Sequence, residues 1–362
     1  MKILLVLGTR PEIIKLSPII RECERLGLDY SVLHTGQHYS YSMDKVFFED
    51  LELQDAKYKL DTGSGSHGEQ TGKMLIEIEK TLKKEKPDVV LVQGDTNSTL
   101  AGALTAAKLQ IKVGHVEAGL RSYDQTMPEE VNRVLTDHCS DYLFAPTEKS
   151  KKNLLDEGIS EKKVFVVGNT VVDAIYQNLE IANHKRDTLN QLELTAKNYF
   201  LVTVHRQENV DNQRRFNDIL RGLKKIKSEF DVPVVYPVHP RSRKQMKQFG
   251  LQPNTIRLID PVDFLSFLQL ESNAKLVLTD SGGVQEETCV FGVPCVTLRD
   301  NTERPETLEV GSNILAGTDS EKILECVKMM VTQKNRWENP LEDGNTGKRI
   351  VEELSNIKSF RT

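Results

Sequence analysis

The sequence predicts an α/β fold class made of two doubly wound, Rossmann-like domains that face each other across a cleft. Short apolar runs of strand length alternate with longer segments that carry apolar residues at helical spacing. The alternation occurs in two successive series, and 362 residues are enough for two domains with complete cores. Because strands separated by helices join parallel sheets through right-handed crossovers, each series should form one parallel sheet covered by helices.

The first series is expected to form a domain over residues 1–168. Its helices include residues 11–26, which begin at a proline suited to the first helical turn, and residues 71–84. The expected strands share an apolar interior and end at polar or glycine-rich positions: residues 2–7, 30–34, 89–93, 112–116, 142–145 and 164–167.

The second series is expected to form a domain over residues 169–345, with the linker near residues 168–175. Its clearest helix covers residues 212–228. The expected strands again have apolar interiors: residues 199–204, 234–238, 256–258, 276–279 and 295–298. A last helix within residues 346–362 is expected to pack back on the first domain, because the helix before it already closes the second.

Composition argues against several classes of partner. The net charge is −5 and no long basic run occurs, so we expect no nucleic-acid partner. The longest apolar stretches have strand length, and the N-terminal MKILLVLGTR lacks a cleavage site, so we expect neither a membrane partner nor a signal peptide. The five cysteines form no CxxC pair, which favours reduced, buried thiols in a cytoplasmic protein over a disulfide between Cys289 and Cys295.

The segment KLVLTDSGGVQEE, residues 275–287, is the most informative motif. An apolar strand ends at Asp280, and Ser281, Gly282 and Gly283 then turn the backbone into a helix. Glycine permits a close approach to a ligand, and a helix N-terminus offers free N–H groups and a partial positive charge, which suits a phosphate. Glu287 follows about one helical turn later, where a carboxylate can accept two ribose hydroxyls. The motif therefore indicates a nucleotide site.

Ligands of open α/β sheets bind beyond the carboxyl ends of the strands, and the first domain places ionisable residues there. Arg10, with Lys15 a turn further on, follows the first strand; helix capping and solvation are the alternative explanations. Asp95 follows the third strand within GDTNST, where an N-cap role for the aspartate or a threonine is equally common. Glu117 ends the fourth strand and is harder to explain as a cap. Glu129 and Glu130 begin a helix, where one suits the helix dipole and the other a ligand.

The second domain adds further candidates at its strand ends. His205 and His239 follow two strands, although a lone histidine is often structural and Pro240 also suggests a turn. Arg304, in the loop after the last expected strand, is suited to bidentate contact with a diphosphate, with surface solvation as the alternative. The sequence has no GxGxxG, Walker lysine or zinc-ligand spacing, so we expect no cofactor and no metal.

Taken together, these motifs resemble the non-hydrolysing UDP-N-acetylglucosamine 2-epimerases. The resemblance extends in order from Lys2 to Pro305 and includes the following segments: GTRPEIIKLSPII, VQGDTNSTLAGAL, GHVEAGLRS, MPEEVNR, VHRQEN, TDSGGVQEE and TERPE. It implies the GT-B-type fold shared with many nucleotide-sugar glycosyltransferases, a UDP-sugar substrate and a homodimer. It also implies interconversion of UDP-N-acetylglucosamine and UDP-N-acetylmannosamine by elimination and re-addition of UDP through a glycal intermediate.

The resemblance also implies site residues. The catalytic set is Asp95, Glu117, Glu129 and His205. The substrate-binding set is Arg10 and Lys15 for the diphosphate and sugar, Phe267 near the uracil, Ser281, Gly282 and Gly283 for phosphate, Glu287 for ribose, and Arg304 for the diphosphate. Two departures from the bacterial members occur: Val262, where they carry a polar residue beside the base, and the region around Gln37 and His38, where they bind an allosteric second substrate molecule.

Three alternatives remain at this stage. A 2-epimerase of a modified UDP-sugar, such as a diacetamido uronic acid, would need extra basic contacts to the sugar, which the sequence does not identify. A glycosyltransferase of the same fold would need an acceptor groove but not carboxylates on both faces of the ring. A non-catalytic sensor of nucleotide sugars would have lost one of the carboxylates Asp95, Glu117 and Glu129, and all three are present.

Overall fold

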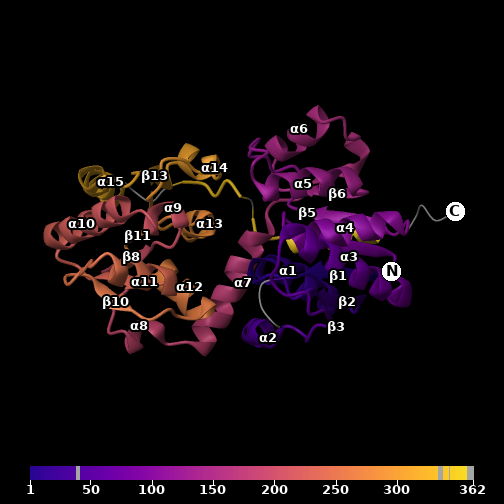
Figure 1. Ribbon diagram of the computed structural model, residues 1–362, viewed down its shortest axis with the longest axis horizontal. Helices are drawn as coiled ribbons and strands as arrows, with labels where there is room; N and C mark the ends of the chain where they lie inside the picture. Colours follow the sequence, from indigo (N-terminus) through magenta and orange to yellow (C-terminus); the bar gives the residue numbers. More distant parts are fainter. Residues whose placement is uncertain (38–40, 333–336, 342, 357–362) are drawn as a thin grey trace. The chain divides into compact units, whose positions relative to one another are not determined.

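The computed structural model describes residues 1–37, 41–332, 337–341 and 343–356 and shows two compact units (Figure 1). One unit comprises Met1–Tyr176 and Leu341–Thr362, and the other comprises Gln177–Pro340. The chain passes from the first unit to the second within helix α7 (Thr170–Lys185), which occupies most of the segment expected to be a linker. Each unit holds one parallel sheet with helices on both faces, as the sequence predicts.

The first unit contains a seven-stranded sheet in the order β3-β2-β1-β4-β5-β6-β7. Its strands are β1 (Lys2–Leu7), β2 (Asp29–His34), β3 (Tyr58–Lys59), β4 (Val89–Gln93), β5 (Lys112–Val116), β6 (Tyr142–Ala145) and β7 (Val164–Val166). Its helices besides α7 are α1 (Arg10–Arg25), α2 (Tyr41–Asp50), α3 (His67–Glu85), α4 (Asn97–Lys108), α5 (Pro128–Cys139), α6 (Glu148–Asp156), the 3₁₀ turn η1 (Glu161–Lys163) and α16 (Thr346–Asn356).

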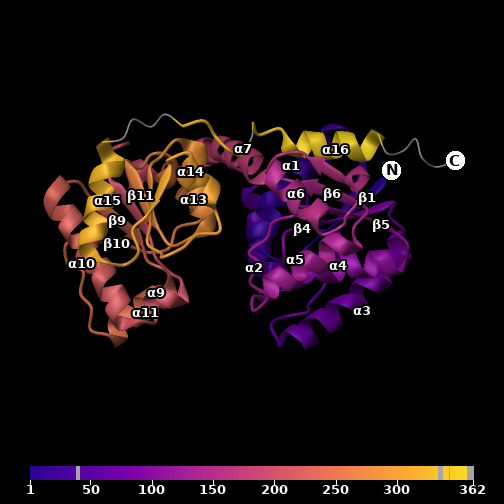
Figure 2. The ribbon, with the colours of Figure 1, turned by 90° about the horizontal axis from the view of Figure 1, so that it is seen from above.

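The central strands of this sheet are apolar on both faces because helices cover both faces. Leu4 and Val6 of β1 pack with Met74 and Ile78 of α3, whereas Leu5 is buried on the opposite face. Figure 2 shows α1 and α16 together on one face and α3, α4 and α5 on the other. The C-terminal helix α16 packs on α1, where Gly347 fits so closely over Pro18 that an added Cβ would lie 2.9 Å from a backbone atom.

The second unit contains a six-stranded sheet in the order β10-β9-β8-β11-β12-β13. Its strands are β8 (Phe200–Thr203), β9 (Val234–Pro237), β10 (Arg257–Ile259), β11 (Leu276–Thr279), β12 (Cys295–Thr297) and β13 (Asn313–Leu315). Its helices besides α7 are α8 (Thr188–Gln191), α9 (Gln207–Val210), α10 (Gln213–Phe230), α11 (Pro240–Gln248), α12 (Phe264–Ser272), α13 (Gly282–Phe291), α14 (Pro305–Glu309) and α15 (Ser320–Thr332).

Two edge strands, β3 and β13, were not predicted. Each is short, and β3 pairs with β2 through only Tyr58 and Lys59, so neither carries an apolar run that would distinguish it from a loop. All five cysteines are free, as expected, although Cys139 is only partly buried. Within the described ranges, every helix is too short or too polar to cross a bilayer.

Candidate functional site

The strand order defines a topological switch point in each unit. In the first unit β1 pairs with β2 on one side and β4 on the other, and in the second unit β8 pairs with β9 and β11. At such a point successive crossovers lead away to opposite sides, so the loops after the two central strands separate and leave room for a ligand. The loops after β1, β4, β8 and β11 carry many of the residues that the sequence predicts for the site.

The first unit brings Lys15 and Glu117 into direct contact. Lys15 Nζ lies 2.6 Å from Glu117 Oε1, and Gln93 at the end of β4 donates a hydrogen bond to the other carboxylate oxygen. Glu117 is 7% exposed and has a φ of +68°, a conformation that non-glycine residues adopt rarely. Residues in such conformations often occur at functional sites, where the surrounding structure maintains them. Glu117 is therefore a buried carboxylate paired with Lys15, and no helix begins at it.

Asp95 is held in place by α5. Arg133 forms an ion pair with its carboxylate, and Asn132 Nδ2 donates to its carbonyl oxygen over 2.9 Å. Thr96, not Asp95, caps α4, because the Thr96 hydroxyl accepts a hydrogen bond from the Thr99 amide. The expected N-cap in this segment is therefore confirmed at Thr96, and Asp95 does not serve as the cap.

The two glutamates at the start of α5 have different environments. Glu130 is buried and accepts hydrogen bonds from the backbone amides of Ser122 and Tyr123, and those bonds lower the pKa of its carboxyl despite its burial. Glu129 is exposed in the first turn of the helix. Glu130 is thus the structural member of the pair, and Glu129 is accessible to a ligand. No contact with the other predicted site residues of this unit is seen for Glu129 among the described residues.

Arg10, the first residue of α1, contacts α2. Its Nε lies 3.0 Å from Oδ1 of the buried Asp44, and its guanidinium lies 4.8 Å from the ring centroid of Phe47. The predicted alternatives of capping or simple solvation therefore do not describe this side chain. Gln37, in the region compared with the allosteric segment of bacterial members, is buried and accepts a hydrogen bond from the Ser98 amide over 2.9 Å. His38 lies outside the described residues.

Glu12 is a central polar residue that sequence reasoning missed. It is 1% exposed, and its carboxylate accepts hydrogen bonds from the Gly8 amide (2.9 Å) and the Thr96 hydroxyl (2.7 Å), which join the loops after β1 and β4. Burial raises the pKa of this carboxyl, while those hydrogen bonds oppose the rise. Its position in the GTRPE turn was the available signal, but one acidic residue in a first helical turn is too common to indicate such a link.

In the second unit, Asp280 joins the loops after β8 and β11. Its fully buried carboxylate accepts hydrogen bonds from the backbone amides of His205 (3.1 Å) and Arg206 (3.0 Å) and from the side chain of Asn209 (3.1 Å). Nδ1 of the His205 ring also lies 3.3 Å from Asp280. Asp280 was predicted only as the end of a strand, and the structure shows that it positions His205 beside the glycine turn.

The turn of Ser281, Gly282 and Gly283 leads directly into α13. Gly282 lies close to the Glu303 side chain, and a Cβ added there would lie 2.6 Å from a carboxylate oxygen that would have to shift. Arg304 lies 3.1 Å from the buried Glu286 of α13, so the arginine is held against the helix instead of extending into solvent.

Phe267 and Glu287 are both partly buried in the second unit. Phe267 of α12 and Val262 pack against the apolar cluster that α12 and α13 share with the sheet. Glu287 lies on α13 and interacts with Glu271 of α12.

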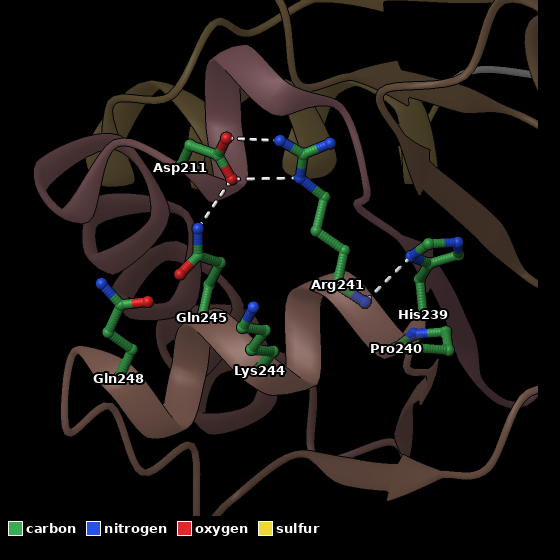
Figure 3. Close-up of a pocket in the computed structure, with 7 residues that line it drawn as sticks. All are labelled: Asp211, His239, Pro240, Arg241, Lys244, Gln245 and Gln248. Atoms are coloured by element: carbon green, nitrogen blue, oxygen red, sulfur yellow. Dashed lines mark hydrogen bonds and ion pairs between the residues drawn. The ribbon is translucent and has the colours of Figure 1, made fainter. Parts of the chain in front are cut away.

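A shallow pocket lies beside α11 in the second unit (Figure 3). Asp211, which lines it, forms an ion pair with Arg241 and accepts a hydrogen bond from Gln245 over 2.7 Å. His239 lines the pocket and accepts a hydrogen bond from the Arg241 amide, which confirms its expected turn role. Burial, and then the neighbouring His205 ring 5.9 Å away, lowers the pKa of His239.

These two parallel-sheet units, each with polar side chains at its switch point, define a GT-B-like α/β protein. A family model described as UDP-N-acetylglucosamine 2-epimerase matches residues 21–355. A Methanocaldococcus jannaschii protein named UDP-N-acetylglucosamine 2-epimerase is 58% identical and covers 98% of this chain and 99% of its own length. The chain therefore belongs to the UDP-N-acetylglucosamine 2-epimerase family, whose members are isomerases.

Two further comparisons are informative about ligands. The crystal structure of the M. jannaschii enzyme in complex with UDP-GlcNAc and UDP matches with a TM-score of 0.87 at 58% identity, over 98% of this chain and 100% of that one. A Pseudomonas aeruginosa protein named UDP-2,3-diacetamido-2,3-dideoxy-D-glucuronate 2-epimerase is 42% identical and covers 99% of this chain and 100% of its own length.

Proposed function

We propose that this protein interconverts UDP-N-acetylglucosamine and UDP-N-acetylmannosamine by inverting carbon 2 of the sugar. One observation carries the proposal: a relative 58% identical over nearly the whole chain was crystallised with UDP-GlcNAc and UDP. The geometry agrees with it, because the structure holds Glu117 in a rare backbone conformation beside Lys15 and holds His205 beside the glycine turn.

The chemistry of carbon 2 explains why these groups are needed. Its proton has no adjacent carbonyl to acidify it, and oxidation at that carbon is closed because it bears an amide nitrogen instead of a hydroxyl. If UDP leaves from carbon 1, positive charge develops there and the neighbouring proton becomes removable. A 2-acetamidoglucal forms, is reprotonated on its other face, and UDP adds back. The enzyme must therefore stabilise a departing diphosphate and supply acid and base groups near the ring.

Each unit supplies part of this machinery in the proposal. From the first unit, Asp95, Glu117 and Glu129 provide acid and base groups, while Arg10 and Lys15 contact the diphosphate and the sugar. From the second unit, the N-terminus of α13 at Ser281, Gly282 and Gly283 holds phosphate, and His205 and Arg304 add positive charge. Phe267 lies near the uracil and Glu287 accepts the ribose hydroxyls. Lys15 Nζ lies 2.6 Å from the Glu117 carboxylate, so in the proposal the cation and the acid–base group lie side by side.

Solvent exchange tests this proposal directly. Purified protein incubated with UDP-N-acetylglucosamine in deuterated water is expected to place deuterium at carbon 2, because the proton that returns comes from a group in exchange with solvent. Mass spectrometry and proton NMR of the recovered nucleotide sugars measure the label. Recovery of unlabelled sugar would contradict the proposal, and release of a free sugar would indicate a hydrolase.

The same exchange experiment addresses the runner-up function. The relative from Pseudomonas aeruginosa makes a UDP-diacetamido uronic acid the natural competitor as substrate. We expect faster exchange with UDP-N-acetylglucosamine, because the 58% identical relative carries that name. Faster exchange with the uronic acid would assign the chain to the second substrate.

We also propose a homodimer that acts in the cytoplasm. The free cysteines fit a reducing compartment.

A surface of the first unit fits the dimer. Residues of α5 and the residue before it form an exposed apolar row spaced by one helical turn: Met127 is 38%, Val131 44% and Leu135 47% exposed. An exposed apolar row of this kind marks an interaction site, and a second copy of the chain is the occupant that the family resemblance implies.

Light scattering tests the homodimer. The native protein is expected to have the mass of two chains. Leu135→Lys is expected to shift the mass towards one chain, because the dimer would then have to bury a charge in the apolar row. Val46→Lys, which alters an exposed apolar residue of α2, serves as the control. A single-chain mass for the native protein would contradict the dimer, and an unchanged dimer in Leu135→Lys would place the interface elsewhere.

A further inference from the structure

A buried carboxylate of α5 contacts the chain on both sides of Glu117. His115, the penultimate residue of β5, is 0% exposed, and its ring Nδ1 lies 2.6 Å from Oδ1 of the buried Asp137. The other oxygen of Asp137 accepts a hydrogen bond from the Gly119 amide over 3.1 Å. One side chain therefore binds the segment two residues before Glu117 and two residues after it.

The ring of His115 connects this carboxylate to the neighbouring loop. Its Nε2 lies 2.8 Å from the carbonyl oxygen of Gly94, which follows β4 and precedes Asp95. A carbonyl oxygen can only accept, so Nε2 donates. Burial raises the pKa of the Asp137 carboxyl, but the charges of His115 and Arg121 and their hydrogen bonds hold it below its ordinary value. Asp137 is thus an ionised acceptor, and both ring nitrogens of His115 donate.

Arg121 completes the network and ties it to α6. Its side chain is 1% exposed and lies 2.7 Å from Asp137 Oδ2, and its Nε lies 2.7 Å from Oε1 of Glu157, which follows α6. Buried charges are costly unless they are paired, and these are paired. Gly119 has a φ of +81°, and a Cβ added there would lie 2.3 Å from the carbonyl oxygen of Ser150. The turn that carries Glu117 is therefore fixed by α5 and α6 together.

We propose that Asp137 is a positioning residue for the acid–base chemistry: it clamps the turn on both sides of Glu117 and fixes the direction of that carboxylate. The inference rests on the proposed function, in which Glu117 exchanges a proton with carbon 2. The φ of +68° at Glu117 persists only where the surrounding structure maintains it. Without the clamp the turn can relax and move the carboxylate away from Lys15, and a displacement of about 1 Å can cost about a hundredfold in rate.

Asp137→Asn tests the clamp with almost no change in shape. An asparagine amide presents N–H groups where one carboxylate oxygen accepted, so either His115 or Gly119 loses its acceptor. At saturating UDP-N-acetylglucosamine, the rate of deuterium incorporation is expected to fall by about ten- to a hundredfold. KM and the dissociation constant of UDP should change by less than about threefold, because the clamp acts on the reacting group and not on binding. Exchange at the native rate would overturn the inference.

A double-mutant cycle shows whether Asp137 acts through Glu117. In Glu117→Gln protein, adding Asp137→Asn is expected to slow exchange further by less than about threefold, because residues that act as a unit have non-additive effects. A merely structural role would slow exchange by the same factor in both backgrounds, which would overturn the inference. Asp55→Asn is the matched control: its side chain is 50% exposed and pairs with Lys59 on the surface, so exchange should stay near the native rate.

A second variant decides the matter if Asp137→Asn does not fold. His115→Gln keeps the Asp137 carboxylate bonded to Gly119, but a single amide nitrogen cannot serve both Asp137 and the Gly94 carbonyl. Exchange is expected to fall at least about threefold. UDP affinity and the far-UV circular dichroism spectrum should stay native, and the fall should disappear in the Glu117→Gln background. A native exchange rate in His115→Gln would overturn the inference.

The outcomes also separate the clamp from the proposed function. A native protein that places no deuterium at carbon 2 would defeat the proposed function and this inference with it. Native exchange that Glu117→Gln slows and Asp137→Asn leaves unchanged would defeat the positioning role alone. Native exchange that Glu117→Gln leaves unchanged would remove the acid–base role of Glu117, and the clamp would then have no catalytic group to position.

Discussion

Glu117→Gln is expected to slow deuterium incorporation at carbon 2 by about two to four orders of magnitude, the usual contribution of a general acid or base. Glutamine has the same shape and can occupy the same backbone conformation, but it cannot take up a proton. Lys15 and Gln93 then remain as neighbours of an uncharged amide. UDP binding should be retained within about tenfold, because Lys15 is the one proposed UDP contact that touches Glu117 and the others lie on other residues. Exchange rates by mass spectrometry and titrations with UDP measure the two effects separately.

Glu79→Gln is the matched control for this prediction. Glu79 lies on the surface of α3 in the same unit, is 46% exposed in its side chain and pairs with Lys83. The same chemical change there should leave exchange close to the native rate, since exposed ion pairs contribute little. Native exchange in Glu117→Gln would remove Glu117 from the catalytic set. Loss of UDP binding together with exchange would assign it to substrate binding instead.

Asp280→Ala should produce the largest combined loss of stability and ligand affinity in the second unit. The change leaves the amides of His205 and Arg206 and the side chain of Asn209 without their buried acceptor. Each unsatisfied buried group costs about 1–3 kcal/mol, so the free energy of unfolding should fall by about 3 kcal/mol or more. UDP affinity should fall at least about tenfold, because His205 and the glycine turn lose their common anchor.

The single tryptophan makes this prediction measurable in one unit of a two-unit protein. Trp337 belongs to the second unit and donates a hydrogen bond to the carbonyl of Cys289 on α13 over 2.9 Å, so its fluorescence in urea reports unfolding around the proposed phosphate site. Asp260→Ala is the control, because Asp260 is 93% exposed in its side chain and pairs only on the surface with Arg243. Its effect should stay within about 0.5 kcal/mol. A similar small effect at Asp280 would show that the loop after β8 does not need this carboxylate.

The local pattern of the chain was sufficient to predict the class of fold. Alternating apolar runs and amphipathic segments predicted the two parallel sheets, and elements such as β4 and β11 begin and end where the sequence indicated. The short strands β3 and β13 could not be predicted, because their pairing comes from the edge of a sheet and not from their own residues.

The candidate residues were also recognisable from sequence, but their partners were not. Polar residues that follow strands predicted Asp95, Glu117 and His205, because the carboxyl ends of parallel strands share one edge of a sheet. The contact between Lys15 and Glu117 joins residues 102 positions apart in the chain. No local pattern in the sequence indicates a contact between residues so far apart. The ion pair between Asp95 and Arg133 and the anchoring of Arg304 by Glu286 are of the same kind.

The sequence by itself therefore determined most of the strands and helices and which of them end in ionisable side chains, because both depend on residues close together in the chain. Only the tertiary structure decided that β1 lies beside β4 and β8 beside β11, which sets the switch points. It also decided that Asp280 anchors the loop of His205 and that Lys15 contacts Glu117. The physical reason is that strand order and burial arise from long-range packing, so a common residue such as aspartate becomes a buried anchor only in the folded chain.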